Sequence, residues 1–124
     1  NLGRSAGTNS VALDVHCDGS AAPPPQYSAS NRTLHWGWKL ICTGVVHIAI
    51  RDDLYEVVGS GDNEHYEWVA YVARSATATN VAATGARNCA GSTATTYIAK
   101  ATGTVDGVPF PAVWSNTHTF PCGA

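Results

Sequence analysis

The fold is decided by residues 34–51, which read LHWGWKLICTGVVHIAIR. The apolar side chains of this stretch recur at even-numbered positions: Leu34, Trp36, Trp38, Leu40, Cys42, Val46, Ile48 and Ile50. Successive side chains of a β-strand point to opposite faces, so this period of two predicts β-structure with one buried face. Thr43 and Gly44 form a turn signal, and we favour a hairpin with a three-residue loop at 42–44. A single bent strand gives the same alternation and is the alternative.

The favoured hairpin gathers four basic or titratable side chains on its outer face. Its register sets Lys39 opposite His47 and His35 opposite Arg51, and these four residues are the candidate ligand-binding site. They could bind an anionic group. The two histidines and the lysine could also serve as general base, general acid and oxyanion stabiliser for phosphodiester cleavage. We prefer the plainer interpretation, a solvated face of an amphipathic hairpin, and assign no catalytic residue.

Alternation and turn signals extend along the rest of the chain. Strands are expected at three further places: residues 10–18, 54–58 and 64–74. The last of these would present four side chains on one face: Tyr66, Trp68, Ala70 and Val72. Three consecutive prolines make 18–32 a long loop. Residues 75–88 are rich in alanine and threonine, and there we favour strand plus loop over a helix at 81–87.

The C-terminal part carries the clearest turn signal. Asp106-Gly107 is a dipeptide typical of two-residue hairpin turns. A hairpin centred there pairs residues whose numbers sum to 213, which sets Trp114 opposite Ala99. Pro109 and Pro111 have no N–H donor, so the second strand of this hairpin should begin at a sheet edge or at a bulge.

The four cysteines are widely separated along the chain, and no two of them form a CxxC motif. This spacing is unlike that of zinc sites and is typical of two disulfides in an oxidising compartment. Spacing alone leaves three connectivities open. The C-terminal register places Cys122 opposite residue 91, close to Cys89. By the alternation, Cys17 and Cys42 both point to the core, from strands that the proline loop joins. We therefore predict the disulfides Cys17–Cys42 and Cys89–Cys122.

The composition indicates a single all-β domain, residues 1–124. Hydrophobic residues make up 44% of the chain and charged residues 13%, and helix formers are scarce. We predict an antiparallel β-sandwich of six to eight strands with two disulfides, and a partly closed β-barrel is the alternative. No apolar run approaches the ~18 residues of a membrane span. The net charge of −2 argues against a nucleic-acid partner, and we expect a monomer.

Two further groups of residues suggest binding chemistry. The four tryptophans could form a sugar-stacking platform, but all have core-facing parity, and we expect at least three of them in the core: Trp36, Trp38, Trp68 and Trp114. The polar segment 61–67 could bind calcium or a transition metal through its carboxylates and His65. It contains neither an EF-hand loop nor an HExxH motif. We therefore expect a surface hairpin loop there, no bound metal and no cofactor.

The chain has five arginines against two lysines, and two segments rich in alanine and threonine, 73–79 and 93–104. Near its end it reads TVDG at residues 104–107 and TFPC at residues 119–122. In these features the C-terminal part resembles small secreted, disulfide-bonded proteins of high-GC actinomycetes. The resemblance implies an extracellular location and disulfides, and it implies no particular activity.

Two functional hypotheses follow. The chain begins at Asn1 rather than Met, which we interpret as a mature secreted chain. Because loops on a rigid β-scaffold commonly carry recognition, we expect a secreted, non-catalytic binding protein. Its partner would be a protein, as for an exported inhibitor, or a cell-surface glycan. The alternative is a small secreted hydrolase or nuclease that uses His35, Lys39 and His47.

Overall fold

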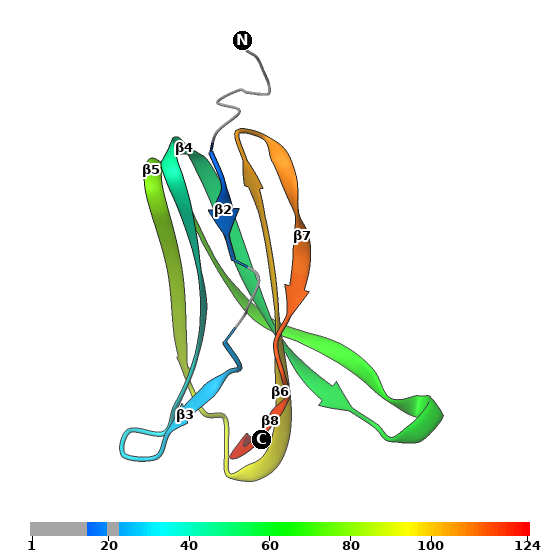
Figure 1. Ribbon diagram of the computed structural model, residues 1–124. Helices are drawn as coiled ribbons and strands as arrows, with labels where there is room; N and C mark the ends of the chain where they lie inside the picture. Colours follow the sequence, from blue (N-terminus) through cyan, green and yellow to red (C-terminus); the bar gives the residue numbers. More distant parts are fainter. Residues whose placement is uncertain (1–14, 20–22) are drawn as a thin grey trace.

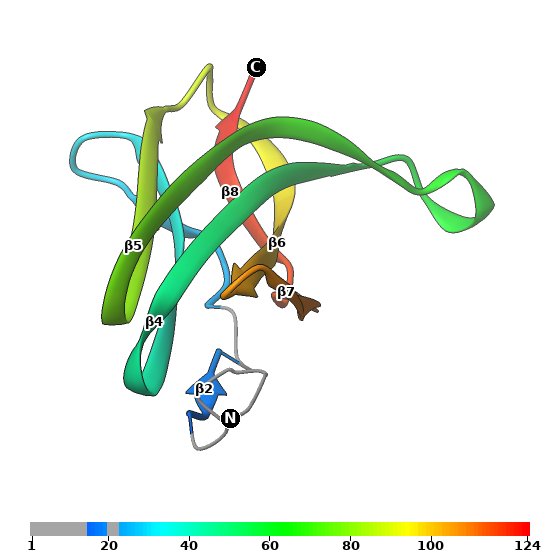
Figure 2. The same ribbon diagram turned by 90° about the horizontal axis from the view of Figure 1, so that it is seen from above.

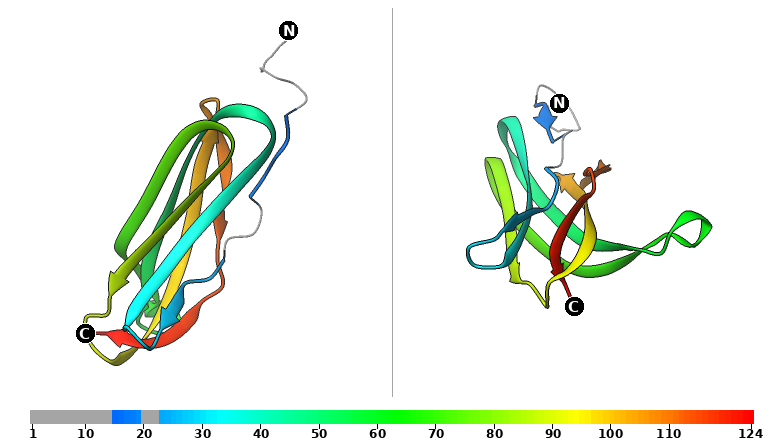
Figure 3. Two further views of the ribbon diagram at one scale, coloured as in Figure 1. Left: turned by 90° about the vertical axis from the view of Figure 1, so that its left-hand side faces the viewer. Right: turned by 90° about the horizontal axis from the view of Figure 1, so that it is seen from below.

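The computed structural model describes residues 15–19 and 23–124. Seven strands in this part of the chain form one antiparallel sheet, which curls into a half-barrel (Figure 1; Figure 3). They are β2 (Cys17–Asp18), β3 (Gln26–Ser28), β4 (Thr33–Val58), β5 (His65–Asn88), β6 (Thr93–Val105), β7 (Val108–Trp114) and β8 (His118–Gly123). A 3₁₀ turn, η1 (Gly61–Asn63), separates β4 from β5. The predicted all-β class is confirmed. The single curled sheet corresponds to the alternative architecture, a partly closed β-barrel.

β4 is one bent strand. It pairs with β5 over nearly its whole length, and the register shifts between Ile41 and Val46, where the strand bends. Figure 1 shows β4 rising to this bend and then descending. Both halves of β4 pair with β5, so they do not pair with each other across a turn at 42–44. The favoured hairpin is therefore wrong, and the single bent strand is correct.

The two halves of β4 meet in the core. Side chains from both halves belong to one buried cluster, which contains Trp38, Leu40, Cys42, Val46, Ile48 and Ile50 together with Val81, Ala83 and Ala101. A second buried cluster contains Leu34, Trp36, Leu54, Tyr97 and Cys122. The alternation thus predicts the buried face of β4 correctly, although it does not predict the partner strand.

β5 continues as a strand through residues 75–88, in contrast to the predicted strand plus loop. Its β-branched and small side chains suit a strand that pairs with the tryptophan-rich start of β4, as in the pair Trp36 and Gly85. β4 and β5 together form a long ribbon. The tip of this ribbon, residues 59–64, projects away from the rest of the molecule (Figure 2).

The proline-rich segment contains a strand that the sequence does not predict. β3 begins directly after Pro25 and pairs with the start of β4, with Gln26 opposite His35. The residues of β3 all have N–H donors, so they can join the sheet once the prolines end. The prediction of a loop throughout 18–32 is therefore wrong at β3.

Both predicted disulfides are present. Cys17 lies directly opposite Cys42 in the sheet, and a disulfide joins them. The second disulfide joins Cys89 to Cys122 and ties the end of β5 to β8. Of the strand predicted at 10–18, the structure describes β2; residues 10–14 lie outside the described part of the chain.

The predicted turn at Asp106-Gly107 is confirmed. Both residues have positive φ angles, 50° and 82°, as a type I′ turn requires. Val105 pairs with Val108 directly beside the turn, which is the predicted register. β6 and β7 therefore form the expected C-terminal hairpin.

Gly85 leaves room for the indole of Trp36, and we expect Gly85→Ala to destabilise the fold. A Cβ atom at position 85 would lie 2.7 Å from Trp36 Cζ2 and 2.9 Å from Trp36 Cε2. The ring is 6% exposed, and its Nε1 donates a hydrogen bond to the Asp52 carbonyl, so it cannot simply move away. We expect the free energy of unfolding, measured by urea denaturation, to fall by about 1–3 kcal/mol.

Ala86→Thr is the matched control for Gly85→Ala, because Ala86 is the next residue of β5 and is exposed. Its free energy of unfolding should stay within about 0.5 kcal/mol of the wild-type value. If Gly85→Ala were as stable as this control, the close packing of Trp36 on β5 would be contradicted.

Candidate functional site

The structure separates the four residues that the sequence predicts in one cluster. All four occupy odd-numbered positions of β4, on the outside of the curled sheet, because the even-numbered positions fill the core. His35 and Lys39 lie before the bend, and His47 and Arg51 lie after it. Since the two halves of β4 meet through their buried faces, the two pairs point away from each other. The predicted opposition of these pairs is wrong, because β5 replaces the second half of the hairpin as the partner.

Within each half the candidate residues also lie too far apart to act on one group, although His35 and Lys39 line the same pocket. His35 and Lys39 are four residues apart on one strand, which corresponds to about 13 Å at ~3.3 Å per residue. The His47 ring nitrogen Nδ1 lies 3.4 Å from Thr77 Oγ1, and the backbone N–H of His47 donates to Asp106 Oδ1 at 2.8 Å. The four residues therefore do not converge on one group of a substrate.

A β-bulge in β5 turns Trp68 to the outside of the sheet. The register between β4 and β5 shifts at Val69. Ala70 lies on the inward face, as predicted, whereas Tyr66 and Trp68 on the other side of the bulge are 45% and 54% exposed. A slip of one residue moves every following side chain to the opposite face. The predicted common face of Tyr66, Trp68, Ala70 and Val72 is therefore wrong for the first two.

A second bulge, in β7, has the same effect on Trp114. Beyond Pro111 the register of β6 and β7 shifts by one residue, so Trp114 lies opposite Lys100 rather than Ala99. Its side chain is 44% exposed. The expectation that the strand with the two prolines begins at a sheet edge or at a bulge is confirmed, because β7 is an edge strand and its register shifts beyond Pro111. The expectation of at least three buried tryptophans is wrong, because two are buried, Trp36 at 6% and Trp38 at 2% exposure.

The two exposed tryptophans join three tyrosines on one outer surface. The pairing of β5, β4, β6 and β7 places Tyr71, Asp53, Lys100 and Trp114 in one row across the sheet. Trp68 and Tyr55 are paired in the neighbouring row. We name this surface the aromatic face, and it consists of Arg51, Asp53, Tyr55, Tyr66, Trp68, Tyr71, Lys100 and Trp114.

Asp53 orders one half of the aromatic face. Its carboxylate oxygens accept hydrogen bonds from Arg51 Nε at 3.0 and 3.1 Å, and Arg51 Nη2 lies 2.9 Å from Oδ1. Trp68 Nε1 donates to the same oxygen at 3.0 Å. The Arg51 guanidinium lies 4.0 Å from the centre of the Tyr71 ring, as in a cation–π contact. This network fixes the rings of Trp68 and Tyr71, whose centres are 6.2 Å apart.

The other half of the aromatic face is a cluster of rings. The ring centres of Tyr66 and Trp114 are 5.3 Å apart, and Tyr55 lies 5.7 Å from Trp114 and 6.3 Å from Tyr66. Lys100 Nζ lies 5.3 Å from the centre of the Trp114 ring. Burial, and then the charge of Asp53, raise the pKa of Tyr55, so its hydroxyl is neutral at physiological pH. The surface is therefore mainly neutral ring area edged by cations.

Sequence reasoning missed most of the aromatic face. Arg51 is the one residue of the predicted ligand-binding site on it, and Trp68 and Trp114 were considered for a stacking platform but expected in the core. Asp53, Tyr55, Tyr71 and Lys100 were not among the candidates. One signal was available in the doublet Asp52-Asp53. Neighbouring residues of a strand point to opposite faces, so one of two adjacent carboxylates must point into the core and the other to the outer face.

The polar segment 61–67 forms the exposed tip of the ribbon, as predicted. His65 Nε2 lies 3.1 Å from Glu67 Oε2, and its Nδ1 lies 3.0 Å from the Asn63 carbonyl oxygen. The hydrogen bond to Asn63, and then that to Glu67, raise the pKa of His65. Within residues 15–19 and 23–124, no three His, Cys, Asp or Glu side chains come together as metal ligands. That no metal is bound stays a prediction.

Comparison with known proteins assigns no family. No protein-family model matches the chain, and no curated protein matches it either. Among solved structures it is similar to Spo0M, the sporulation control protein from Bacillus subtilis, with 8% sequence identity and a TM-score of 0.34. The similarity covers 90% of this chain and 48% of that chain, so this chain spans about half the length of Spo0M. None of the described residues belongs to a helix that is long and apolar enough to cross a membrane.

Proposed function

We propose that the protein is a secreted, non-catalytic binding protein and that its aromatic face binds a protein partner. The observation that carries this proposal is the pair of bulges, which expose Trp68 and Trp114 on an ordered sheet surface. Contiguous exposed apolar surface on a soluble protein marks interaction sites. Two disulfides fit an oxidising compartment outside the cell.

The paired polar groups in the Asp53 half of the aromatic face favour a protein over a glycan. A glycan needs free polar side chains beside the stacking rings, because its hydroxyl groups must be hydrogen-bonded. Arg51 and the indole N–H of Trp68 are already bonded to Asp53. Trp, Tyr and Arg are the residue types that dominate the energetic centres of protein interfaces. Because the rings are held in place before binding, little conformational entropy is lost on association.

The alternative function, a small hydrolase or nuclease, lacks support from the geometry. It requires His35, Lys39 and His47 near one substrate group, since general acids and bases act within hydrogen-bond reach of the reacting atoms. His47 lies beyond the bend of β4, on a surface that points away from the other two residues. We therefore propose binding rather than catalysis.

Trp68→Ala tests the proposed binding surface. Because this side chain is 54% exposed, its removal should leave the fold intact, which circular dichroism checks. Partner proteins are isolated from the extracellular medium of the producing organism on the immobilised wild-type protein. We expect the affinity of such a partner, measured by calorimetry, to fall about 30-fold, as for an interface residue worth about 2 kcal/mol.

Ile41→Ala is the matched control, because Ile41 is 51% exposed but lies at the bend of β4, outside the aromatic face. It should bind the partner as tightly as the wild type does. A partner whose affinity survives both Trp68→Ala and Trp114→Ala would overturn the proposed surface. Binding of glycans that these two variants abolish, without any protein partner, would assign the aromatic face to a glycan instead.

A further inference from the structure

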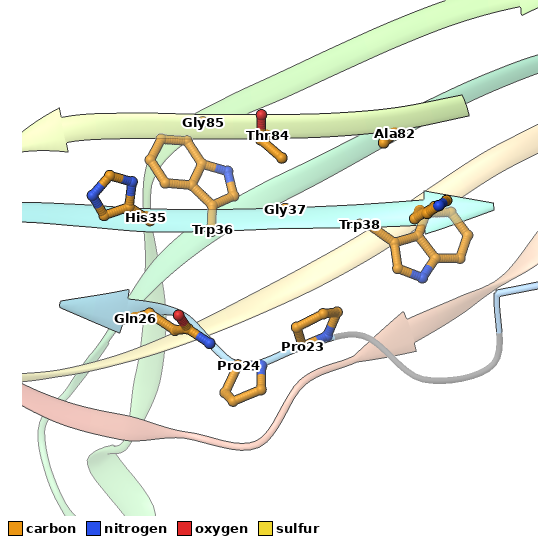
Figure 4. Close-up of a pocket in the computed structure, with 11 residues that line it drawn as sticks. Pro23, Pro24, Gln26, His35, Trp36, Gly37, Trp38, Ala82, Thr84 and Gly85 are labelled. Atoms are coloured by element: carbon orange, nitrogen blue, oxygen red, sulfur yellow. The ribbon is translucent and has the colours of Figure 1, made fainter. Parts of the chain in front are cut away.

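A pocket lies at an uncovered edge of β4, apart from the aromatic face. β3 pairs with β4 at residues 33–35 and β2 pairs with it at residues 41–42, so no described strand covers this edge at residues 36–40. A pocket of about 410 Å³ opens there beside Gly37 (Figure 4). Small-molecule sites usually have volumes of roughly 300–1,000 Å³. The pocket is on the half of β4 before the bend, so it is separate from the aromatic face.

Rings form the walls of the pocket. Figure 4 shows Pro23 and Pro24 lying alongside the strand that carries Trp36 and Trp38. Both indole N–H groups donate to backbone carbonyls at 3.0 Å, Trp36 to Asp52 and Trp38 to Gly19. The indoles are thereby fixed, and because Trp36 and Trp38 are only 6% and 2% exposed, a small part of their apolar ring surface faces the pocket. Gly37 contributes no side chain between them; a Cβ atom there would lie 2.6 Å from the Ala83 carbonyl oxygen, so the glycine lets β5 lie close to β4.

The polar groups of the pocket include positive charge and no carboxylate. They are Gln26, His35, Lys39 and Thr84. Lys39 is exposed, and its ammonium makes no hydrogen bond or ion pair with a residue of the described ranges. The amide of Gln26 and the hydroxyl of Thr84 are neutral hydrogen-bond donors. This set of groups is complementary to an anion, because a ligand carboxylate or sulfonate would find a cation and donors, and no like charge.

We propose that this pocket binds a small aromatic anion, a flat ring that carries an acidic group. The ring packs against the prolines and the two indoles beside Gly37, and the acidic group pairs with Lys39. A neutral ring lacks the ion pair, and a cationic ring meets the charge of Lys39. The proposal does not depend on the function of the aromatic face.

Titration with 2-naphthalenesulfonate, followed by NMR of the ¹⁵N-labelled protein, tests the proposal. The four tryptophans give four indole N–H signals, which distinguish the pocket from the aromatic face. We expect saturable shifts for the indoles of Trp36 and Trp38 and for the amide of Gly37, and no shift for Trp68 or Trp114. The cationic analogue 2-naphthylmethylammonium should bind about tenfold more weakly or less, because it lacks the charge-assisted contact.

Substitution of Lys39 tests the role of charge. Lys39→Ala should weaken naphthalenesulfonate binding about tenfold, and Lys39→Glu should reverse the preference in favour of the ammonium compound. Lys100→Ala is the matched control, because Lys100 is the other lysine of the chain and belongs to the aromatic face. It should bind the sulfonate like the wild type. The proposal is overturned if no saturable shift occurs, if the shifts fall on Trp68 and Trp114, or if Lys39→Ala binds equally well.

Discussion

The protein is expected to lose about 4 kcal/mol of its free energy of unfolding as the pH rises from 3.8 to about 7, and Asp52→Asn should abolish this loss. Asp52 is fully buried, opposite Val72 of β5 and Ala101 of β6. Neither of its carboxylate oxygens has a hydrogen-bond partner among the described residues. Burial, and then the charge of Asp53, raise the pKa of Asp52 to about 7.

The direction of the effect follows from which state holds the proton. Below pH 3.8 the Asp52 carboxyl is protonated in both the folded and the unfolded chain, so this group takes nothing from the stability. Between this pH and about 7 the unfolded chain releases the proton and the folded protein keeps it, so stability falls by about 1.4 kcal/mol per pH unit. Above pH 7 the folded protein ionises as well, and this group causes no further loss.

Urea denaturation at a series of pH values from roughly 4 to 8 measures this dependence. Asp52→Asn keeps the shape of the side chain but cannot ionise. The fall of its free energy of unfolding with pH should therefore be less steep than that of the wild type, by the contribution of Asp52. Asp62→Asn is the control, because Asp62 is exposed at the tip of the ribbon, and it should keep the wild-type slope. A wild-type stability that is constant or rises over this range would contradict a neutral, buried Asp52.

Removal of the Cys89–Cys122 disulfide is expected to have an effect of similar size. The disulfide closes a sequence separation of 33 residues, and its constraint on the unfolded chain is worth about 4 kcal/mol. Cys122 is 3% exposed in the second core cluster, so truncation to alanine also removes buried contacts. We expect the double variant Cys89→Ala/Cys122→Ala to unfold at a temperature lower by at least about 10 °C, as measured by calorimetry.

The pair Cys17→Ala/Cys42→Ala provides the comparison. Its disulfide closes a separation of 25 residues, for which the same argument gives about 3.5 kcal/mol. Thiol titration of each unfolded variant verifies that the remaining disulfide is intact. If each double variant lost less than about 1 kcal/mol, the two disulfides would not be the constraints that the loop argument requires.

Features that depend on nearby residues were predictable from the sequence. The buried face of β4 follows from its alternation, and the C-terminal hairpin follows from Asp106-Gly107. The hairpin at 42–44 failed because alternation gives the face of a strand and contains no information about its partner. β5 pairs with both halves of β4, so the two halves do not pair with each other. Lys39 and His47, which the hairpin would pair, therefore lie on different surfaces.

Most of the aromatic face could not be predicted from the sequence, for a related reason. A bulge adds one residue to a strand and reverses the faces of all side chains beyond it, without a change in composition. Pro109 and Pro111 indicated one such position, and Trp114 is turned outward there. At Val69 no proline or glycine marks the shift that exposes Trp68.

The central position of β4 also determines the order in which the molecule can assemble. Its pairs with β5 connect residues progressively farther apart along the chain, from Val58 and His65 at the tip to Thr33 and Asn88 at the far end. β6 is added to the other edge of the same strand, and β7 pairs in turn with β6, both from still later parts of the chain. Sheets that depend on such distant pairings fold in milliseconds to seconds, far more slowly than helical bundles. Because the aromatic face draws residues from β4, β5, β6 and β7, it exists only when the last of these strands has joined, and a newly made chain cannot engage a partner there before folding is complete.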